Sequence, residues 1–204
     1  NHNNLVAQYR TIEFALGLIF LGFIGILINF YINLNDIISV CLLVLGITIF
    51  IFFFLKLKSK NKKTELIFIF LIIILSTFLS FYSLSNDDFD YHFQTIKYFK
   101  ELKLFDIEHD RRTSYNSHWL LINALFYLTK FPESVFCISS LLYTLIIFDF
   151  YRSFKKNYSS NNYLPTIYSV LVLFFLIGVM SKYKNFGIDF PGQIIILFVF
   201  LIFF

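Results

Sequence analysis

Residues 37–55 read IISVCLLVLGITIFIFFFL, a stretch without a single charged side chain. A helix needs about 18 or more apolar residues to cross the roughly 30 Å of hydrocarbon in a bilayer. The whole chain has this character, since 58% of its residues are hydrophobic and only 15% are charged. Runs such as Leu66–Leu75 lack the polar and apolar alternation of a membrane-spanning β-strand. The sequence therefore predicts an all-α integral membrane protein.

Several apolar runs predict transmembrane helices, and together they predict a polytopic helix bundle. They lie near residues 12–32, 37–55, 65–84, 134–151, 165–181 and 193–204. One further run, 118–131, is shorter and contains His118, Asn123 and Lys130. The chain starts without Met and stops inside an apolar run, so we expect residues 1–204 to form one membrane domain, the N-terminal fragment of a longer protein.

A lysine-rich connection sets the expected topology. It contains Lys56, Lys58, Lys60, Lys62 and Lys63 and no acid, so the positive-inside rule places it in the cytoplasm. Counting helices from this connection places Arg10 inside and residues 85–117 outside. The basic cluster Arg152–Lys156 is expected to be cytoplasmic as well.

This topology requires that one of the two runs 118–131 and 134–151 does not cross the membrane. We expect 118–131 to form a short juxtamembrane or re-entrant helix on the outer face, which is tolerated where protein surrounds it. The alternative is that Lys182 and Lys184 mark the cytoplasmic side and that the topology inverts after residue 131.

The outer connection opens with the sequence Asn86-Asp87-Asp88-Phe89-Asp90-Tyr91-His92. Apolar residues then recur at helical spacing, which predicts an amphipathic helix over about 88–104 that lies in the membrane interface; they are Phe89, Phe93, Ile96, Phe99 and Leu102. The apolar side of this helix is expected to enter the headgroup region, with its lysines near lipid phosphates. On one interpretation the acids only open this helix, with Asn86 or Asp87 as N-cap.

The other interpretation is catalytic. A carboxylate at the membrane surface can act as a general base or can hold a divalent cation against a phosphate. Mutual repulsion between clustered carboxylates raises the pKa of one of them, and Mg²⁺ prefers oxygen ligands. Arg111 and Arg112 follow in the same connection, and the planar guanidinium group suits a phosphate. His118 and Trp119 open the next apolar run, where they could equally anchor the chain at the interface.

These motifs resemble the GT-C superfamily, polytopic glycosyltransferases that use polyprenyl-phosphate sugars, and more closely a group of uncharacterised bacterial GT-C-like membrane proteins. The resemblance rests on the acidic stretch 87–92, the lysine-rich helix after it, the entry Asn116-Ser117-His118-Trp119, and the later Gly187-Ile188-Asp189-Phe190-Pro191. It covers most of the chain and implies a GT-C-like N-terminal part.

The resemblance also implies roles for individual residues. Asp87 matches the first acid of the family's acidic pair and is the implied catalytic base, with Asp88 as its partner and Asp189 as the second-loop acid. Donor phosphate or acceptor binding is implied for His92, Arg111, Arg112 and His118. A divalent cation, Mg²⁺ or Mn²⁺, is the cofactor that this chemistry suggests, with Asp87, Asp88 and Asp189 as its ligands.

The sequence thus predicts a multi-pass protein of the bacterial inner membrane that transfers a sugar from a polyprenyl-phosphate donor to a cell-envelope acceptor at the non-cytoplasmic face. Its expected partners are membrane lipid and the lipid-linked sugar, and nucleic-acid binding has no support. One alternative is a transporter or flippase, for which Asp149, Gly17, Gly22 and Gly25 are the residues to consider. Another is a non-catalytic subunit of envelope glycan assembly.

Overall fold

The computed structural model describes residues 10–56, 59–80, 92–104, 106, 118–178 and 189–203 of the chain. These residues are helical or lie in short turns, and among them the only β-type pairing is an isolated bridge between Leu128 and Phe131. The helices are α2 (Arg10–Tyr31), α3 (Asp36–Lys56), α4 (Ser59–Ser80), α5 (Phe93–Glu101), α6 (His118–Phe126), the 3₁₀ helix η2 (Pro132–Phe136), α7 (Cys137–Ser159), α8 (Tyr163–Gly178) and α9 (Asp189–Phe203). The predicted all-α fold is confirmed for this part of the chain.

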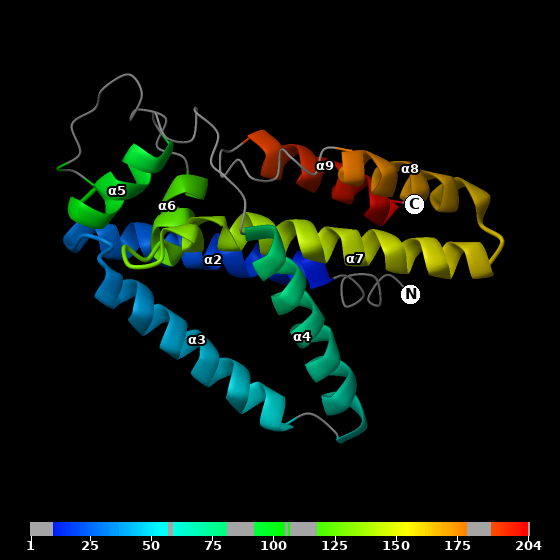
Figure 1. Ribbon diagram of the computed structural model, residues 1–204, viewed down its shortest axis with the longest axis horizontal. Helices are drawn as coiled ribbons and strands as arrows, with labels where there is room; N and C mark the ends of the chain where they lie inside the picture. The colour runs from blue at the N-terminus through cyan, green and yellow to red at the C-terminus, as the bar shows by residue number, and fades with distance from the viewer. Residues whose placement is uncertain are drawn as a thin grey trace.

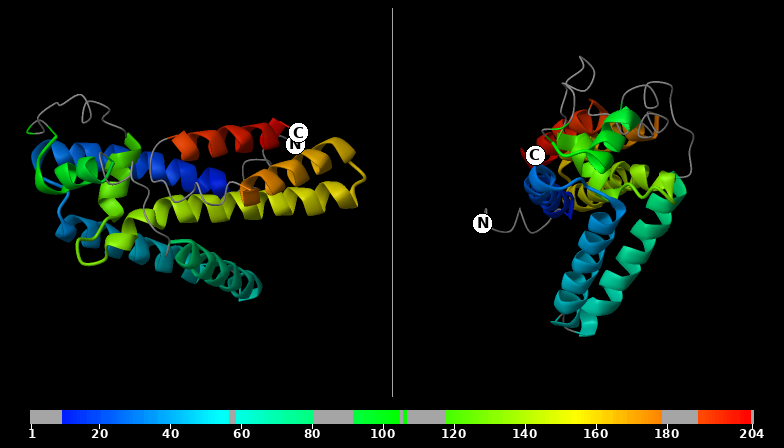
Figure 2. Two further views of the ribbon diagram at one scale, coloured as in Figure 1. Left: turned by 45° about the horizontal axis from the view of Figure 1, so that its top comes forward. Right: turned by 90° about the vertical axis from the view of Figure 1, so that its left-hand side faces the viewer.

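Helix α7 is the centre of the fold and contacts α2, α4, α8 and α9 (Figure 1). Its inward side contributes Leu142, Tyr143, Ile146 and Phe150, all almost fully buried, to a core that also receives Leu176 from α8. Helices α2, α7, α8 and α9 run along the long axis of the molecule, whereas α3 and α4 extend away from this body to one side (Figure 2). The body is therefore built around one long apolar helix.

Among the described residues, three helical segments are long and apolar enough to cross a membrane: Arg10–Tyr31, Asp36–Lys56 and Pro132–Ser159. The predicted runs 65–84 and 165–181 correspond to the shorter apolar helices Glu65–Leu79 and Tyr163–Gly178, so their crossing stays a prediction, as does that of 193–204. Helix α3 has this character on every side, because Ser39 is the only buried residue among those from Asp36 to Lys56. Its exposed residues include Leu43, Ile47 and Phe53, which a soluble protein would cover. A helix that is apolar all round belongs either in a protein core or in a membrane, and α3 is not in the core.

Helix α6 is short and packs against the middle of α2. With nine residues it measures about 14 Å at 1.5 Å per residue, less than half the thickness of a bilayer core. The glycines of α2 allow this close approach, because a Cβ added at Gly25 would lie 2.6 Å from Leu121 Cδ2 and one at Gly22 would lie 2.1 Å from His118 Nε2. Gly22 and Gly25 therefore serve helix packing. Whether α6 is re-entrant in a membrane stays a prediction.

We expect Gly25→Ala to lower the free energy of unfolding by about 1 kcal/mol, because the new methyl group overpacks the contact with buried Leu121. Gly17→Ala in the same helix is the matched control, since nothing lies within 4 Å of a Cβ at that position. Denaturant unfolding of the two variants in the same micelles measures the difference. Equal stability of both variants would show that α6 does not pack on α2 in this way.

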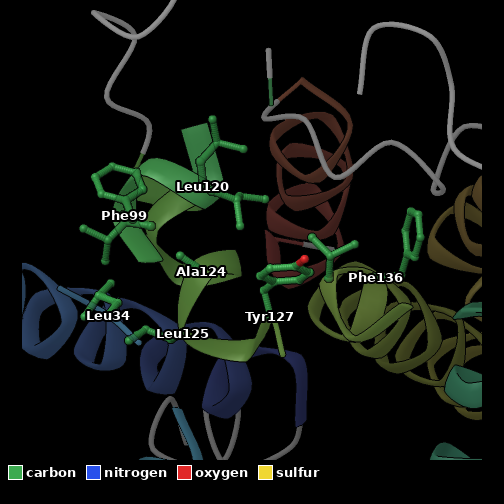
Figure 3. Packing of buried hydrophobic residues seen from close by; sticks show 10 residues of the cluster. Leu34, Phe99, Leu120, Ala124, Leu125, Tyr127 and Phe136 are labelled. Atoms are coloured by element: carbon green, nitrogen blue, oxygen red, sulfur yellow. The ribbon is translucent and has the colours of Figure 1, made fainter. Parts of the chain in front are cut away.

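Helix α5 is held by protein on its apolar side. Ile96 and Phe99 are buried against α6 and the turn between α2 and α3, in a cluster that contains Leu34, Leu120 and Leu125 (Figure 3). The backbone N–H of Leu34 donates to the carbonyl of Phe99 (2.9 Å), and Asn29 Nδ2 donates to the carbonyl of Leu102 (3.2 Å). The side that the sequence assigned to the headgroup region of the membrane is instead covered by protein at Ile96 and Phe99.

Asp149 has a structural role at the other end of the molecule. It is only 3% exposed, and its Oδ2 accepts a hydrogen bond from the backbone N–H of Thr11 at 3.0 Å. A carboxylate at this position satisfies one of the free N–H groups in the first turn of α2 and favours the positive end of its dipole. Asp149, which the sequence offered for a transport path, is thus covered by α2 and caps it.

Candidate functional site

Three of the residues assigned by the GT-C resemblance fall within the described part of the chain. His92 directly precedes α5 and is buried, and His118 opens α6 with its ring against Gly22. Asp189 is the first residue of α9. The remaining residues of that set, Asp87, Asp88, Arg111 and Arg112, lie outside the described residues. The expected approach of Asp87 or Asp88 to Asp189 therefore stays a prediction.

The predicted cation site also stays a prediction. Across residues 10–56, 59–80, 92–104, 106, 118–178 and 189–203, no three His, Cys, Asp or Glu side chains lie close enough to hold a metal ion. The acids that the sequence proposed as ligands were Asp87, Asp88 and Asp189, and two of these are outside that part of the chain.

The structure places another polar cluster where α3, α5 and the turn after α6 meet. Lys100 of α5 forms an ion pair with Asp36 of α3, with Nζ and Oδ1 3.0 Å apart. The same ammonium group donates a hydrogen bond to Ser39 Oγ at 2.8 Å. Asp36 Oδ2 accepts hydrogen bonds from the backbone N–H of Thr129 (3.1 Å) and from its hydroxyl. The Lys100 side chain is only 4% exposed, so this ammonium group is desolvated.

Local sequence explains why these groups meet. Asn35 caps α3, since its Oδ1 accepts a hydrogen bond from the N–H of Ile38 (3.1 Å), and Asp36 then lies at the positive end of the helix dipole. Thr129 lies in a tight turn that is closed by a bond from Phe131 N–H to the Leu128 carbonyl (2.9 Å). The capped start of α3 thus fixes the position of Asp36, and the tight turn fixes the position of Thr129.

Burial changes the acid–base behaviour of the cluster. Desolvation lowers the pKa of Lys100 from its ordinary value of 10.5, and the bond to Asp36 offsets only part of this effect. The pKa of the neighbouring Tyr127 is raised above 10, first by burial and then by the negative charges of Asp36 and Glu101. The Tyr127 hydroxyl is therefore protonated at neutral pH, when it can donate a hydrogen bond.

A small polar pocket opens beside this cluster. Its volume is about 170 Å³, and it is lined by Asn35, Asp36, Lys97, Lys100, Glu101, Tyr127 and Thr129. The ring of Tyr127 forms part of the wall and is held edge-on by Phe93, with the ring centroids 5.3 Å apart. The pocket thus combines carboxylates, amines, an amide and a hydroxyl with one fixed aromatic surface.

A much larger apolar groove lies against the other side of the first turns of α3. Its volume is about 690 Å³, and its walls come from α3, α6, η2 and the start of α7, with Leu21 of α2 and Thr77 of α4. On α3 the groove is lined by residues that include Leu42, Gly46 and Phe50. The two spaces are neighbours, separated by the buried hydrogen bond from Lys100, which lines the pocket, to Ser39, which lines the groove. The combination suits an amphiphile with a long apolar chain and a small polar head.

Sequence analysis did not identify Asp36, Lys100 or Thr129. One signal was available for Lys100, since it follows Ile96 by four residues and therefore lies on the apolar side of α5. A lysine on that side needs an acidic partner inside the protein. No local pattern indicates that the partner is Asp36.

The chain was compared with known proteins. The family model described as "Domain of unknown function (DUF8201)" matches residues 4–204. Neither the curated proteins nor the solved structures include a match.

Proposed function

We propose that this chain is a multi-pass protein of the bacterial inner membrane. It belongs to the DUF8201 family, a domain of unknown function, over residues 4–204. It transfers a sugar from a polyprenyl-phosphate donor to a cell-envelope acceptor at the non-cytoplasmic face. This is a glycosyltransferase of the GT-C type.

The distribution of charge supports the membrane part of the proposal. Arg10 at the start of α2 forms an ion pair with Glu65 of α4 (2.8 Å), and Thr11 contacts Asp149 of α7, which is close in sequence to Arg152. The basic residues that the topology assigns to the cytoplasm thus belong to neighbouring parts of the fold. The start of α3, whose Asn35 and Asp36 line the polar pocket, lies at the opposite end of α2 (Figure 1). This arrangement agrees with the positive-inside rule.

The single observation that carries the proposed function is an apolar groove beside a polar pocket, with the hydrogen bond from Lys100 to Ser39 between them. A polyprenyl phosphate sugar has the same two parts, a long hydrocarbon chain and a small polar head. Binding sites of this kind are mostly apolar with a few polar groups that fix orientation. The groove would hold the chain, and the pocket would place the head at the outer end of the helices.

The chemical step is assigned to the acids that follow α4. Asp87 would take the proton from the acceptor hydroxyl as the oxygen attacks the sugar carbon, and the bond between that carbon and the lipid phosphate would break. Asp88 and Asp189 would orient the acceptor or hold a divalent cation. Arg111 and Arg112 would bind the departing lipid phosphate, since the guanidinium group can donate two parallel hydrogen bonds to it.

Sugar transfer in vesicles tests the proposal. The full-length protein, reconstituted with a radiolabelled polyprenyl-phosphate sugar and an envelope lipid fraction, is expected to move label to the acceptor. Full-length Asp87→Ala, at the same membrane level, is expected to lose transfer because the base is missing. Undiminished transfer by this variant would remove Asp87 from the mechanism.

The same experiment separates the two alternatives. A flippase would move the lipid-linked sugar across the vesicle membrane and leave the sugar on its lipid, and a non-catalytic subunit would do neither. Transfer by wild type is therefore the decisive result. Its absence with every lipid-linked sugar tried, from a protein that still binds the lipid, would overturn the glycosyltransferase proposal.

A further inference from the structure

We propose that the polar pocket binds one uncharged sugar ring, which is the head of the lipid whose chain lies in the groove. The assignment of that lipid as a glycosyl donor rests on the proposed function. The assignment of the pocket to a neutral sugar rests on its own residues.

The charges of the pocket cancel. Its walls carry two basic residues, Lys97 and Lys100, and two acids, Asp36 and Glu101. Lys100 and Asp36 are paired at 3.0 Å and held further by Ser39 and Thr129, so neither charge is free to attract an ion. Lys97 and Glu101 add one charge of each sign, and Lys97 Nζ lies 4.8 Å from the centroid of the Phe93 ring. The pocket therefore has no excess charge for an ionic head and is assigned only the sugar ring, while the phosphate of the donor is assigned to Arg111 and Arg112 as under the proposed function.

The groups that remain suit sugar hydroxyls, which both donate and accept hydrogen bonds. Asn35 uses its Oδ1 to cap α3, so its amide nitrogen is the group that it presents to a ligand. Glu101 can accept two hydrogen bonds and Lys97 can donate them. Tyr127 adds an aromatic edge to the pocket wall with the small part of the residue that is exposed (5%), and its ring is held by Phe93, with the ring centroid 6.0 Å from Lys100 Nζ.

The size of the pocket limits the ligand to one ring. Pockets for drug-sized molecules measure about 300–1,000 Å³, whereas this one measures about 170 Å³. The neighbouring groove of about 690 Å³ is apolar and therefore offers no place for a second sugar. The chain attached to the ring would cross from the pocket to the groove beside Ser39, which lines the groove and accepts the hydrogen bond from Lys100.

Amphiphiles that share one chain and differ in the head test the inference. The protein in nanodiscs is titrated with radiolabelled dodecyl glucoside, dodecylphosphocholine and dodecyl phosphate, and binding is measured by scintillation proximity. Dodecyl glucoside is expected to bind at least about tenfold more tightly than the other two. If dodecylphosphocholine binds most tightly, the pocket takes a zwitterionic head group. If dodecyl phosphate binds most tightly, the pocket takes an anionic head group. Either result, or equal binding of all three, would overturn the proposal.

Two variants connect the binding to the pocket. Tyr127→Leu, which removes the aromatic surface, is expected to weaken dodecyl glucoside binding about tenfold, whereas Tyr127→Phe stays within about threefold. Asn35→Asp retains a side-chain oxygen that can cap α3 but loses the amide donor. We expect this variant to bind dodecyl glucoside about threefold more weakly. Unchanged affinity in Tyr127→Leu and Asn35→Asp would place the sugar elsewhere. If Tyr127→Leu does not fold, Asn35→Asp decides alone.

The binding result is independent of catalysis. Glucoside binding without transfer from any lipid-linked sugar would keep the sugar pocket and overturn the proposed enzyme. Transfer with no preference for dodecyl glucoside, and with no effect of Asn35→Asp on transfer or binding, would keep the enzyme and overturn the sugar pocket.

Discussion

Asp36→Ala is expected to lower the free energy of unfolding by about 3 kcal/mol, because it leaves the ammonium group of Lys100 buried without a counter-charge. The Lys100 side chain is only 4% exposed, so little water can replace the carboxylate. The variant also removes the acceptor of two hydrogen bonds from Thr129, which hold the turn after α6 against α3. Chemical unfolding in micelles, followed by circular dichroism, measures the loss.

Two comparisons make this prediction specific. The double variant Asp36→Ala/Lys100→Met also removes the buried ammonium group, whose partner Asp36 is itself 34% exposed, so it should be more stable than Asp36→Ala alone. Glu13→Ala removes an exposed ion pair with Arg10 and should cost at most about 1 kcal/mol. If Asp36→Ala costs no more than Glu13→Ala, then the pair with Lys100 is not buried as described.

The loss in Asp36→Ala should also depend on pH. Burial lowers the pKa of Lys100 in the folded protein, and Asp36 is the partner that offsets this effect. Without Asp36 the folded-state pKa falls further below the ordinary 10.5. At a pH between the lowered pKa of Lys100 in the folded variant and 10.5, Lys100 binds a proton in the unfolded chain but not in the folded protein. The free energy of unfolding of the variant therefore rises with pH in this range. The deficit of the variant relative to wild type should therefore shrink as the pH is raised toward 10.5, and a deficit that grows would contradict the assignment.

Gly46→Trp is expected to weaken both lipid binding and sugar transfer by roughly tenfold to a hundredfold, because overpacking typically costs about 1–3 kcal/mol. Gly46 lines the groove, and nothing lies within 4 Å of a Cβ at that position. An indole there would enter the space assigned to the lipid chain. The helix itself should not suffer, because glycine is a poor residue in a helix interior.

Gly17→Trp is the matched control. It makes the same change in α2, also in open space, at a position that does not line the groove. We expect this variant to bind and transfer within a few-fold of wild type at the same membrane level. Equal losses in both variants would point to a general effect of the added indole, and no loss in Gly46→Trp would remove the groove from the site.

The helices were predictable from sequence because their signal is local. The run 37–55 contains no charge and is long enough to cross a bilayer, and the structure has α3 over Asp36–Lys56. The amphipathic pattern that starts at Phe89 was found as α5, described over Phe93–Glu101. The pattern did not indicate what covers the apolar side of α5. Periodicity identifies a face but does not distinguish lipid from protein as its neighbour.

The candidate site was less predictable, because its residues come together only in the fold. Lys100 contacts Asp36, which lies far from it in the sequence, and Thr129 reaches the same carboxylate from a third segment. The sequence assigned Lys100 to lipid phosphates together with the other lysines of α5. Gly22 and Gly25, considered first for a transport path, are packing positions for α6.

By itself the sequence determined that the described chain is helical and that Arg10–Tyr31, Asp36–Lys56 and Pro132–Ser159 contain runs long and apolar enough to cross a membrane, because helix formation and transfer into lipid depend on the composition of a short window. Only the tertiary structure decided that α6 packs in the middle of α2, that Asp149 caps α2, and that a polar pocket lies beside an apolar groove. Each of these depends on contacts between residues distant in the chain. A contact of that kind has no signature in either partner's local sequence.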